Sequence, residues 1–198
     1  MRRAIAASLV FAAALLPGCR AQEKPAEPGQ LVLDLRSPDA EKSGHARLLL
    51  ITIGEPAVPA VAELLRSGSP AERIVAANIF WGMGARGRAA VPDLVVALDD
   101  PDSALRAASA MALENMGAAA EPAVPALAKA LSDREPAVRQ AAVKALGAIG
   151  PGARGALPAL TRALRRGSWP EAQDAVRRIR GLEPGAPIEL DPDEHETP

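Results

Sequence analysis

One dipeptide recurs at a fixed interval through most of the chain. Valine-proline steps stand at Val58-Pro59, Val91-Pro92 and Val124-Pro125, and Leu157-Pro158 continues the series, so the four prolines are 33 residues apart. A fixed period of roughly 20 to 50 residues is typical of stacked supersecondary units, each burying its apolar face against its neighbours. The period therefore predicts a repeat architecture before any other feature is considered.

Each period contains two stretches of helical periodicity. Apolar residues follow the Val-Pro step at i, i+3 and i+7, as in Val91, Leu94 and Leu98, and would form one buried stripe. Proline is tolerated there because the first amides of a helix have no intrahelical acceptor. The second stretch ends at a glycine, the residue expected just past a helix end. We expect helices near 38–52, 56–66, 70–82, 90–99, 103–116, 122–132, 136–149, 155–166 and 170–181.

The repeats share a further motif. Asp100 precedes Leu105-Arg106 and Asp133 precedes Val138-Arg139; an Ala-Ala step, a leucine, a glycine and the Val-Pro step follow in both. This unit resembles the short HEAT-like repeats of bacteria, including those of the phycobilisome-lyase type, over residues 38–182. The resemblance implies an all-α fold, a right-handed α-α solenoid of about four to four and a half helix pairs. The Thr-Pro-Leu-His step of ankyrin repeats, which have a similar period, does not occur.

Charged residues also recur with the period. Arg73, Arg106 and Arg139 are one period apart, as are Asp100 and Asp133. The resemblance implies a structural ladder in which these side chains join neighbouring repeats; an anion-binding or catalytic role is the alternative. No aspartate occupies the equivalent positions in the terminal repeats, which are usually atypical in such arrays.

The first residues have the proportions of a signal peptide. Arg2 and Arg3 precede a 13-residue apolar run, and Leu16-Pro17-Gly18-Cys19 follows. This segment resembles the lipobox of bacterial lipoproteins. The resemblance implies cleavage after Gly18, attachment of fatty acids such as palmitate at Cys19, and a location in the cell envelope on the periplasmic or other extracytoplasmic face of a membrane. Ordinary secretion and a retained anchor are the alternatives.

Composition divides the rest of the chain. We expect a signal peptide at 1–18, a flexible tether carrying the lipidated Cys19 at 19–36, the repeat domain at 37–182 and a disordered acidic tail at 183–198. Residues 31–35 are apolar enough to pack on the first repeat. The repeat domain holds 18 Lys/Arg and 15 Asp/Glu, and the tail six acids and no Lys or Arg. The tail either masks the basic last repeat or is simply solvated beside it.

No constellation for catalysis or metal binding is visible. His45 and His195 are 150 residues apart, and no cysteine, histidine or carboxylate cluster has ligand spacing. The serines lack a nucleophile elbow, and no glycine-rich phosphate loop occurs. We therefore expect no enzyme activity, no cofactor and no metal. The near-neutral repeats argue against nucleic-acid binding, which requires a strongly basic face.

Three positions of the second helix in each pair vary between repeats. They are 74, 78 and 81 and their equivalents one period on, and HEAT-like solenoids generally present this helix on their concave side. Exposed aromatic and apolar residues are typical of interfaces. The candidates for partner contact are Ile74, Asn78, Trp81, Met111, Glu114 and Lys144. Alternatively, Trp81 and Ile74 pack beneath residues 31–36 or the first helix.

These features predict a lipid-anchored scaffold that binds another protein, whose identity and oligomeric state the sequence does not specify. The alternative is an accessory subunit of an enzyme or a lyase-like chromophore handler. That role would require a ligand-sized polar pocket rather than an open groove.

Overall fold

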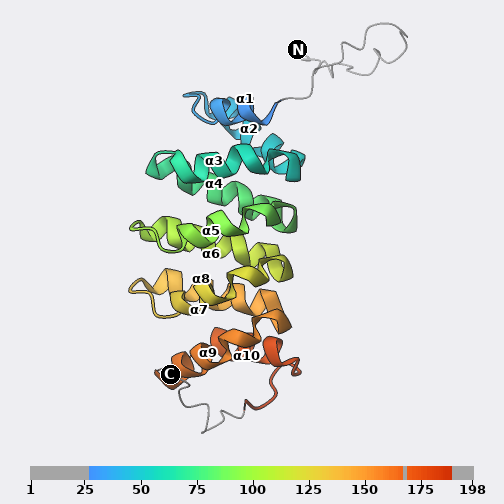
Figure 1. Ribbon diagram of the computed structural model, residues 1–198, viewed down its shortest axis with the longest axis vertical. Coiled ribbons are helices and arrows are strands. Elements are labelled where there is room, and N and C mark those ends of the chain that lie inside the picture. Colours follow the sequence, from blue (N-terminus) through green and yellow to red (C-terminus); the bar gives the residue numbers. More distant parts are fainter. Residues whose placement is uncertain (1–26, 167–168, 189–198) are drawn as a thin grey trace, which may run out of the picture.

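The described part of the chain is built from helices (Figure 1). The computed structural model describes residues 27–166 and 169–188. The α-helices are α1 (Pro28–Asp34), α2 (Ala40–Ile53), α3 (Val58–Ser67), α4 (Pro70–Met83), α5 (Val91–Ala97), α6 (Ser103–Met116), α7 (Val124–Ala130), α8 (Pro136–Ile149), α9 (Leu157–Arg166) and α10 (Pro170–Arg180). The 3-10 helices are η1 (Glu55–Ala57), η2 (Gly84–Ala90), η3 (Gly117–Ala123) and η4 (Gly150–Ala156). The predicted α-α solenoid is confirmed.

The Val-Pro step and the glycine delimit the elements. Prolines 59, 92 and 125 lie in the first turns of α3, α5 and α7, where their missing N–H groups cost no hydrogen bond. The glycines after α4 and α6, Gly84 and Gly117, have φ of 55° and 57°, values that side chains rarely tolerate. The expected turn between glycine and valine is a 3-10 helix of seven residues in η2, η3 and η4 and of three residues in η1.

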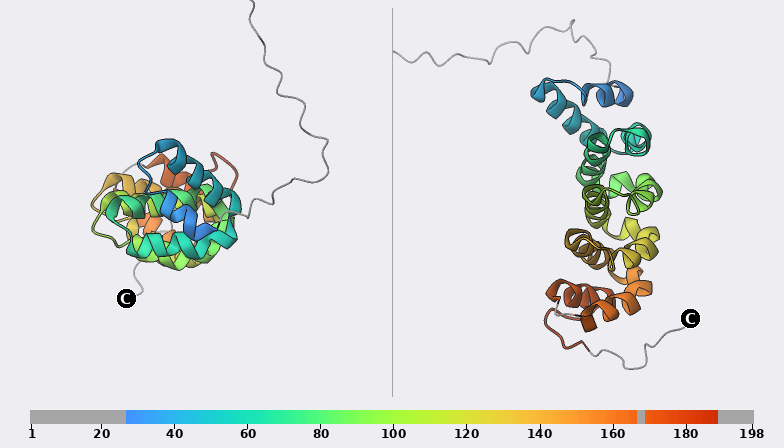
Figure 2. Two further views of the ribbon diagram at one scale, coloured as in Figure 1. Left: turned by 90° about the horizontal axis from the view of Figure 1, so that it is seen from above. Right: turned by 90° about the vertical axis from the view of Figure 1, so that its left-hand side faces the viewer.

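Two layers of helices run the length of the molecule (Figures 1 and 2). The inner layer contains α4, α6, α8 and α10, each packed directly on the next. The outer layer contains α3, α5, α7 and α9, which touch one another much less. Because closer spacing in one layer bends the stack towards it, the inner layer corresponds to the concave side. Its core positions repeat with the period: Phe80, Leu113, Leu146 and Ile179 are all completely buried.

The N-terminal cap differs from the expected tether. Helix α1 begins at Pro28, inside the segment predicted to be flexible up to residue 36, and packs on α2 and α3. Leu31 is buried in that contact, as the apolar run suggested. Arg36 then pairs with Glu72 of α4, so the segment is tied to the first full repeat at two points.

The C-terminal side also departs from the expectation. The predicted tail begins at residue 183, yet Ile188 is partly buried against the core and Arg177 donates a hydrogen bond to the carbonyl of Ala186 at 2.9 Å. Residues 183–188 therefore fold back on α10. The predicted signal peptide, Cys19 and the rest of the acidic tail, with His195, lie outside the described residues.

Candidate functional site

Two ion pairs join neighbouring repeats at the turns between the layers. Arg73 Nη2 lies 2.6 Å from Asp100 Oδ2, and Arg106 donates to both oxygens of Asp133 at 2.8 Å. Arg106 also donates to the carbonyl of Asp100. The hydrogen bonds from Arg106 lower the pKa of the Asp133 carboxyl below its usual value, and the same pairing raises the pKa of Arg106. The structure thus brings together the residues of the two complete steps, Arg73 with Asp100 and Arg106 with Asp133.

These aspartates also determine where the outer helices end. Asp100 accepts a hydrogen bond from the N–H of Asp102, and Asp133 from that of Glu135, both at 2.9 Å. Such local bonds compete with helix propagation. Helices α5 and α7 accordingly end at residues 97 and 130, two residues before the predicted ends. Helices α3 and α9 extend through the equivalent positions, which hold Ser67 and Arg166.

The series of pairs ends at Arg139. Its Nη1 atom donates to the carbonyls of Asp133 and Arg134 at 2.8 and 3.0 Å, as the preceding arginine does in its own turn. No carboxylate pairs with it among the described residues, since the next ladder position is Arg166. Instead, the ring of Trp169 lies 5.6 Å from its guanidinium carbon, within the range of a cation–π contact.

The variable positions of the inner layer expose a small apolar patch. Trp81 on α4 is 49% exposed and Met111 on α6 is 45% exposed. Asn78 is exposed beside them, one turn before Trp81 on α4 and equivalent to Met111 in the repeat. We call Asn78, Trp81 and Met111 the inner-face patch. The alternative that Trp81 packs beneath the N-terminal segment does not hold.

The other candidate positions behave differently from one another. Ile74 is partly buried against the core. Glu114 is partly buried and Lys144 exposed. Position 147, the equivalent of Trp81 on α8, is a buried glycine because α10 approaches there: an added Cβ would lie 3.3 Å from the Cα of Ala175. The variable face is therefore not uniformly exposed: Lys144 lies in solvent, whereas the position of Gly147 is closed by α10.

Sequence reasoning missed Leu48 on α2, which is 64% exposed. Helices α2 and α4 have the same length and end before Gly54 and Gly84, so Leu48 occupies the position on α2 that Asn78 occupies on α4. The signal was present in the sequence, but the first repeat is three residues shorter than the others, and an alignment on the Val-Pro step hides the equivalence.

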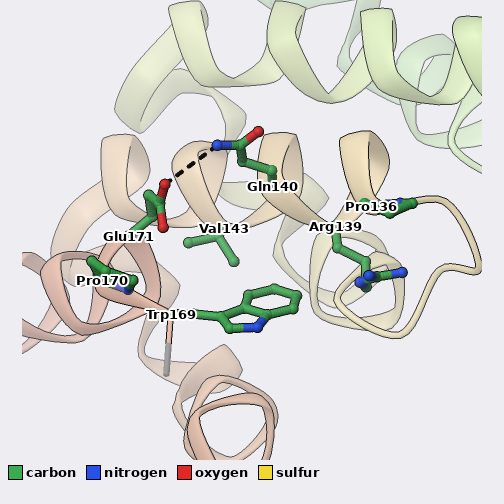
Figure 3. A pocket seen from close by; sticks show the side chains of 7 residues that line it. All are labelled: Pro136, Arg139, Gln140, Val143, Trp169, Pro170 and Glu171. Atoms are coloured by element: carbon green, nitrogen blue, oxygen red, sulfur yellow. Dashed lines mark hydrogen bonds between the residues drawn. The ribbon is translucent and has the colours of Figure 1, made fainter. Parts of the chain in front are cut away.

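A cavity of about 300 Å³ lies between the first turns of α8 and α10 (Figure 3). Its lining residues are Pro136, Arg139, Gln140, Val143, Trp169, Pro170 and Glu171. Val143 is buried and forms an apolar wall, and Gln140 Nε2 donates to Glu171 Oε1 at 3.3 Å between the two helices. The sequence predicted none of this, because the cavity depends on how the last inner helix docks.

Within 27–166 and 169–188, no group of three or more His, Cys, Asp or Glu side chains is arranged to hold a metal ion. In the same ranges no single helix is long and apolar enough to cross a membrane. Taken together, the helices Ala40–Ile53 and Glu55–Ser67 have the length and composition of a membrane span, but they are bent by 118° relative to each other.

The periodic helix pairs and their interlocking Arg–Asp pairs agree with a known repeat type. The family model for HEAT repeats matches residues 57–123 and 91–179, which together span more than half of the chain. The chain belongs to the HEAT-repeat family. This match confirms the HEAT-like repeats that the sequence motif predicted. Comparison with curated proteins finds no match.

Solved structures with similar folds include natural and designed repeat proteins. A chain of the complex of CpcE and CpcF of phycocyanin lyase from Nostoc sp. PCC7120 has 18% identity and a TM-score of 0.61, over 77% of this chain and 97% of that one. A designed armadillo repeat protein has 22% identity and a TM-score of 0.60, over 80% and 84%. Another, in complex with the peptide (KR)4, has 21% identity and a TM-score of 0.57, over 76% and 80%. At these identities the likeness concerns the fold.

Proposed function

We propose that the protein is a lipoprotein of the bacterial cell envelope whose HEAT-repeat solenoid is a scaffold that binds another protein through the inner-face patch. The observation that carries the binding role is the exposure of Trp81 on α4 and Met111 on α6, two helices that pack on each other in the inner layer. Large apolar side chains at such positions gain free energy when a partner removes them from water.

Part of the patch lies outside the core of the solenoid. The neighbouring core position on α4, Phe80, is completely buried, whereas Trp81 has about half of its surface in solvent. The backbone carbonyl of Trp81 accepts a hydrogen bond of 2.6 Å from Asn115 Nδ2. Replacing the indole leaves this backbone hydrogen bond in place, and thermal unfolding of the variant distinguishes a loss of binding from a loss of stability.

The test is a pull-down from solubilised membranes with the full chain and with the double substitution Trp81→Ala and Met111→Ala. We expect the partner to be lost from the double variant, because buried aromatic contacts at interfaces typically contribute about 2 kcal/mol or more, or some 30-fold in affinity. Val96→Ala is the matched control, since Val96 is 74% exposed on the outer helix α5. Equal recovery with both variants would refute the role of the patch.

The membrane anchor is a separate part of the proposal. It is supported by the sequence around Cys19, and lipid chains attached there would hold the solenoid at a membrane surface. Metabolic labelling with a clickable fatty acid should mark the wild-type protein and leave Cys19→Ser unlabelled. Absence of label on the wild type would contradict the anchor without affecting the binding role.

We infer a scaffold rather than an enzyme, because four of the five ladder residues that could serve chemistry are paired with one another, Arg73 with Asp100 and Arg106 with Asp133. The alternative is an accessory subunit of an enzyme or a chromophore handler. The fold it shares with the phycocyanin lyase complex is compatible with that role. A coloured or ultraviolet-absorbing compound that co-purifies with the protein would favour the alternative.

A further inference from the structure

The guanidinium of Arg139 has one edge engaged and one edge available. Its Nη1 atom donates to two backbone carbonyls, while Nε and Nη2 have no acceptor among the described residues. In the preceding repeat, Arg106 uses its Nε and Nη2 edge to hold both carboxylate oxygens of Asp133. The two arginines are anchored to their turns in the same way, so the difference lies in the missing carboxylate.

The missing carboxylate has a cause in the last repeat. Asp100 and Asp133 lie in turns just beyond α5 and α7, but the next position one period on is Arg166, which is the final residue of α9. Helix α9 therefore continues over the residues that form a turn after α5 and α7 in the preceding repeats. The acceptor that this scaffold supplies to Arg73 and Arg106 is therefore not supplied to Arg139 at that position.

Arg139 is one of the residues that line the cavity of about 300 Å³ (Figure 3). This volume is at the lower end of the range for ligand sites, about 300 to 1,000 Å³, and suits one side chain or a small acid. Apolar surface comes from Val143, Trp169 and the two prolines of the lining. Gln140 Nε2 donates a hydrogen bond to Glu171 Oε1, which turns the Glu171 carboxylate towards Gln140.

We propose that this cavity binds a carboxylate that carries an apolar group. The carboxylate takes the place of the ladder aspartate on the Nε and Nη2 edge of Arg139, as a two-pronged, charge-assisted pair. The apolar part lies against Trp169 and Val143. The carboxylate belongs to an acidic side chain of a bound protein or to a free small acid, which share this chemistry. The site is separate from the inner-face patch and does not depend on it.

Trp169 makes the proposal measurable. The chain has two tryptophans, so the exposed Trp81 can be replaced with phenylalanine to leave Trp169 as the single indole of the full chain. The full-length Trp81→Phe protein is titrated with benzoate, with the neutral isostere benzamide, and with the peptide acetyl-Ala-Glu-Ala-amide, while Trp169 emission is recorded. We expect a saturable response to benzoate near millimolar concentration and at least a tenfold weaker one to benzamide.

Substitutions on α8 then distinguish binding by the Arg139 guanidinium from a general effect of positive charge. Arg139→Gln should weaken benzoate binding at least tenfold, whereas Lys144→Gln, which removes one positive charge from an exposed site on the same helix, should leave it unchanged. Arg139→Lys keeps the positive charge but lacks the planar guanidinium that can donate two parallel hydrogen bonds, and should weaken binding severalfold. This variant also provides a folded comparison if Arg139→Gln does not fold.

A response to the peptide equal to or stronger than that to benzoate assigns the site to an acidic side chain of a protein, and a response to benzoate alone assigns it to a small acid. No saturable response to either probe, equal responses to benzoate and benzamide, or unchanged binding in both Arg139 variants would overturn the proposal. None of these readouts requires the protein partner, so this site and the inner-face patch can fail independently.

Discussion

Replacing Asp133 with asparagine removes the charge from the most enclosed ion pair between repeats. The side chains of Arg106 and Asp133 are 7% and 13% exposed, and the carboxylate accepts two bonds from the guanidinium and one from the backbone of Glu135. Breaking a buried pair from one side costs about 3 to 5 kcal/mol. Asparagine retains one acceptor oxygen, so we expect a loss of about 2 to 3 kcal/mol in the free energy of unfolding.

Urea unfolding of the full chain, followed by helical circular dichroism at pH 7, measures this loss. Asp93→Asn is the matched control: Asp93 pairs with Arg66, also 27 residues away, but that arginine is half exposed. Exposed pairs contribute little, so the control should unfold close to the wild type. A loss for Asp133→Asn no larger than that for Asp93→Asn would refute the reasoning.

The dependence on pH follows from the lowered pKa of Asp133. A carboxyl whose pKa is lower in the folded state than in the unfolded state stabilises the fold above its unfolded pKa of about 3.9, and this contribution is lost as the pH falls through the folded pKa. The difference between wild type and Asp133→Asn should therefore be constant from pH 7 to about pH 5 and shrink below about pH 4. A difference that persists unchanged into acid would contradict the pairing.

Three further predictions concern a buried hydroxyl, a glycine at a helix end and the ion pair of the N-terminal segment. Ser109→Ala should stabilise the protein by up to about 1 kcal/mol in the same assay, because the Ser109 hydroxyl is buried without a hydrogen-bond partner among the described residues; a loss of stability would show that it is satisfied. Gly117→Ala should cost about 1 to 3 kcal/mol because its φ is 57°, while Gly155→Ala, with open space around its Cβ and no positive φ, should be nearly neutral. Arg36→Gln should raise the pKa of Glu72 from about 2 towards 4.5 in carboxyl NMR titrations, because the hydrogen bond from Arg36 is the main cause of the lowered value; an unchanged pKa would assign the shift to Ser69.

Much of the fold could be read from local patterns. Prolines at helix starts, glycines at helix ends and apolar residues at helical spacing act within one or two turns, so their effect does not depend on the rest of the molecule. The predicted helices therefore begin within about two residues of the observed ones. The main error, helices α5 and α7 ending early, also has a local cause in the turns of Asp100 and Asp133.

The candidate site was only partly predictable. The varying positions of the inner layer were identified from the alignment of repeats, yet Trp81 is exposed and its equivalent Gly147 is buried. The sequence of α4 or of α8 alone does not indicate which of these two equivalent positions is exposed. The difference arises from the close approach of α10 to α8 at Gly147, which is a property of two helices far apart in the chain.

The period, the helix pairs and the Arg–Asp steps follow from local patterns, because each repeats and each depends on neighbours a few residues or one period away. The packing of the whole solenoid, by contrast, determines which variable side chains remain in solvent and that Arg139 borders a cavity beside Trp169. Both depend on how closely successive helices stack. That spacing follows from the summed volumes of side chains on both sides of a contact, which no single repeat specifies.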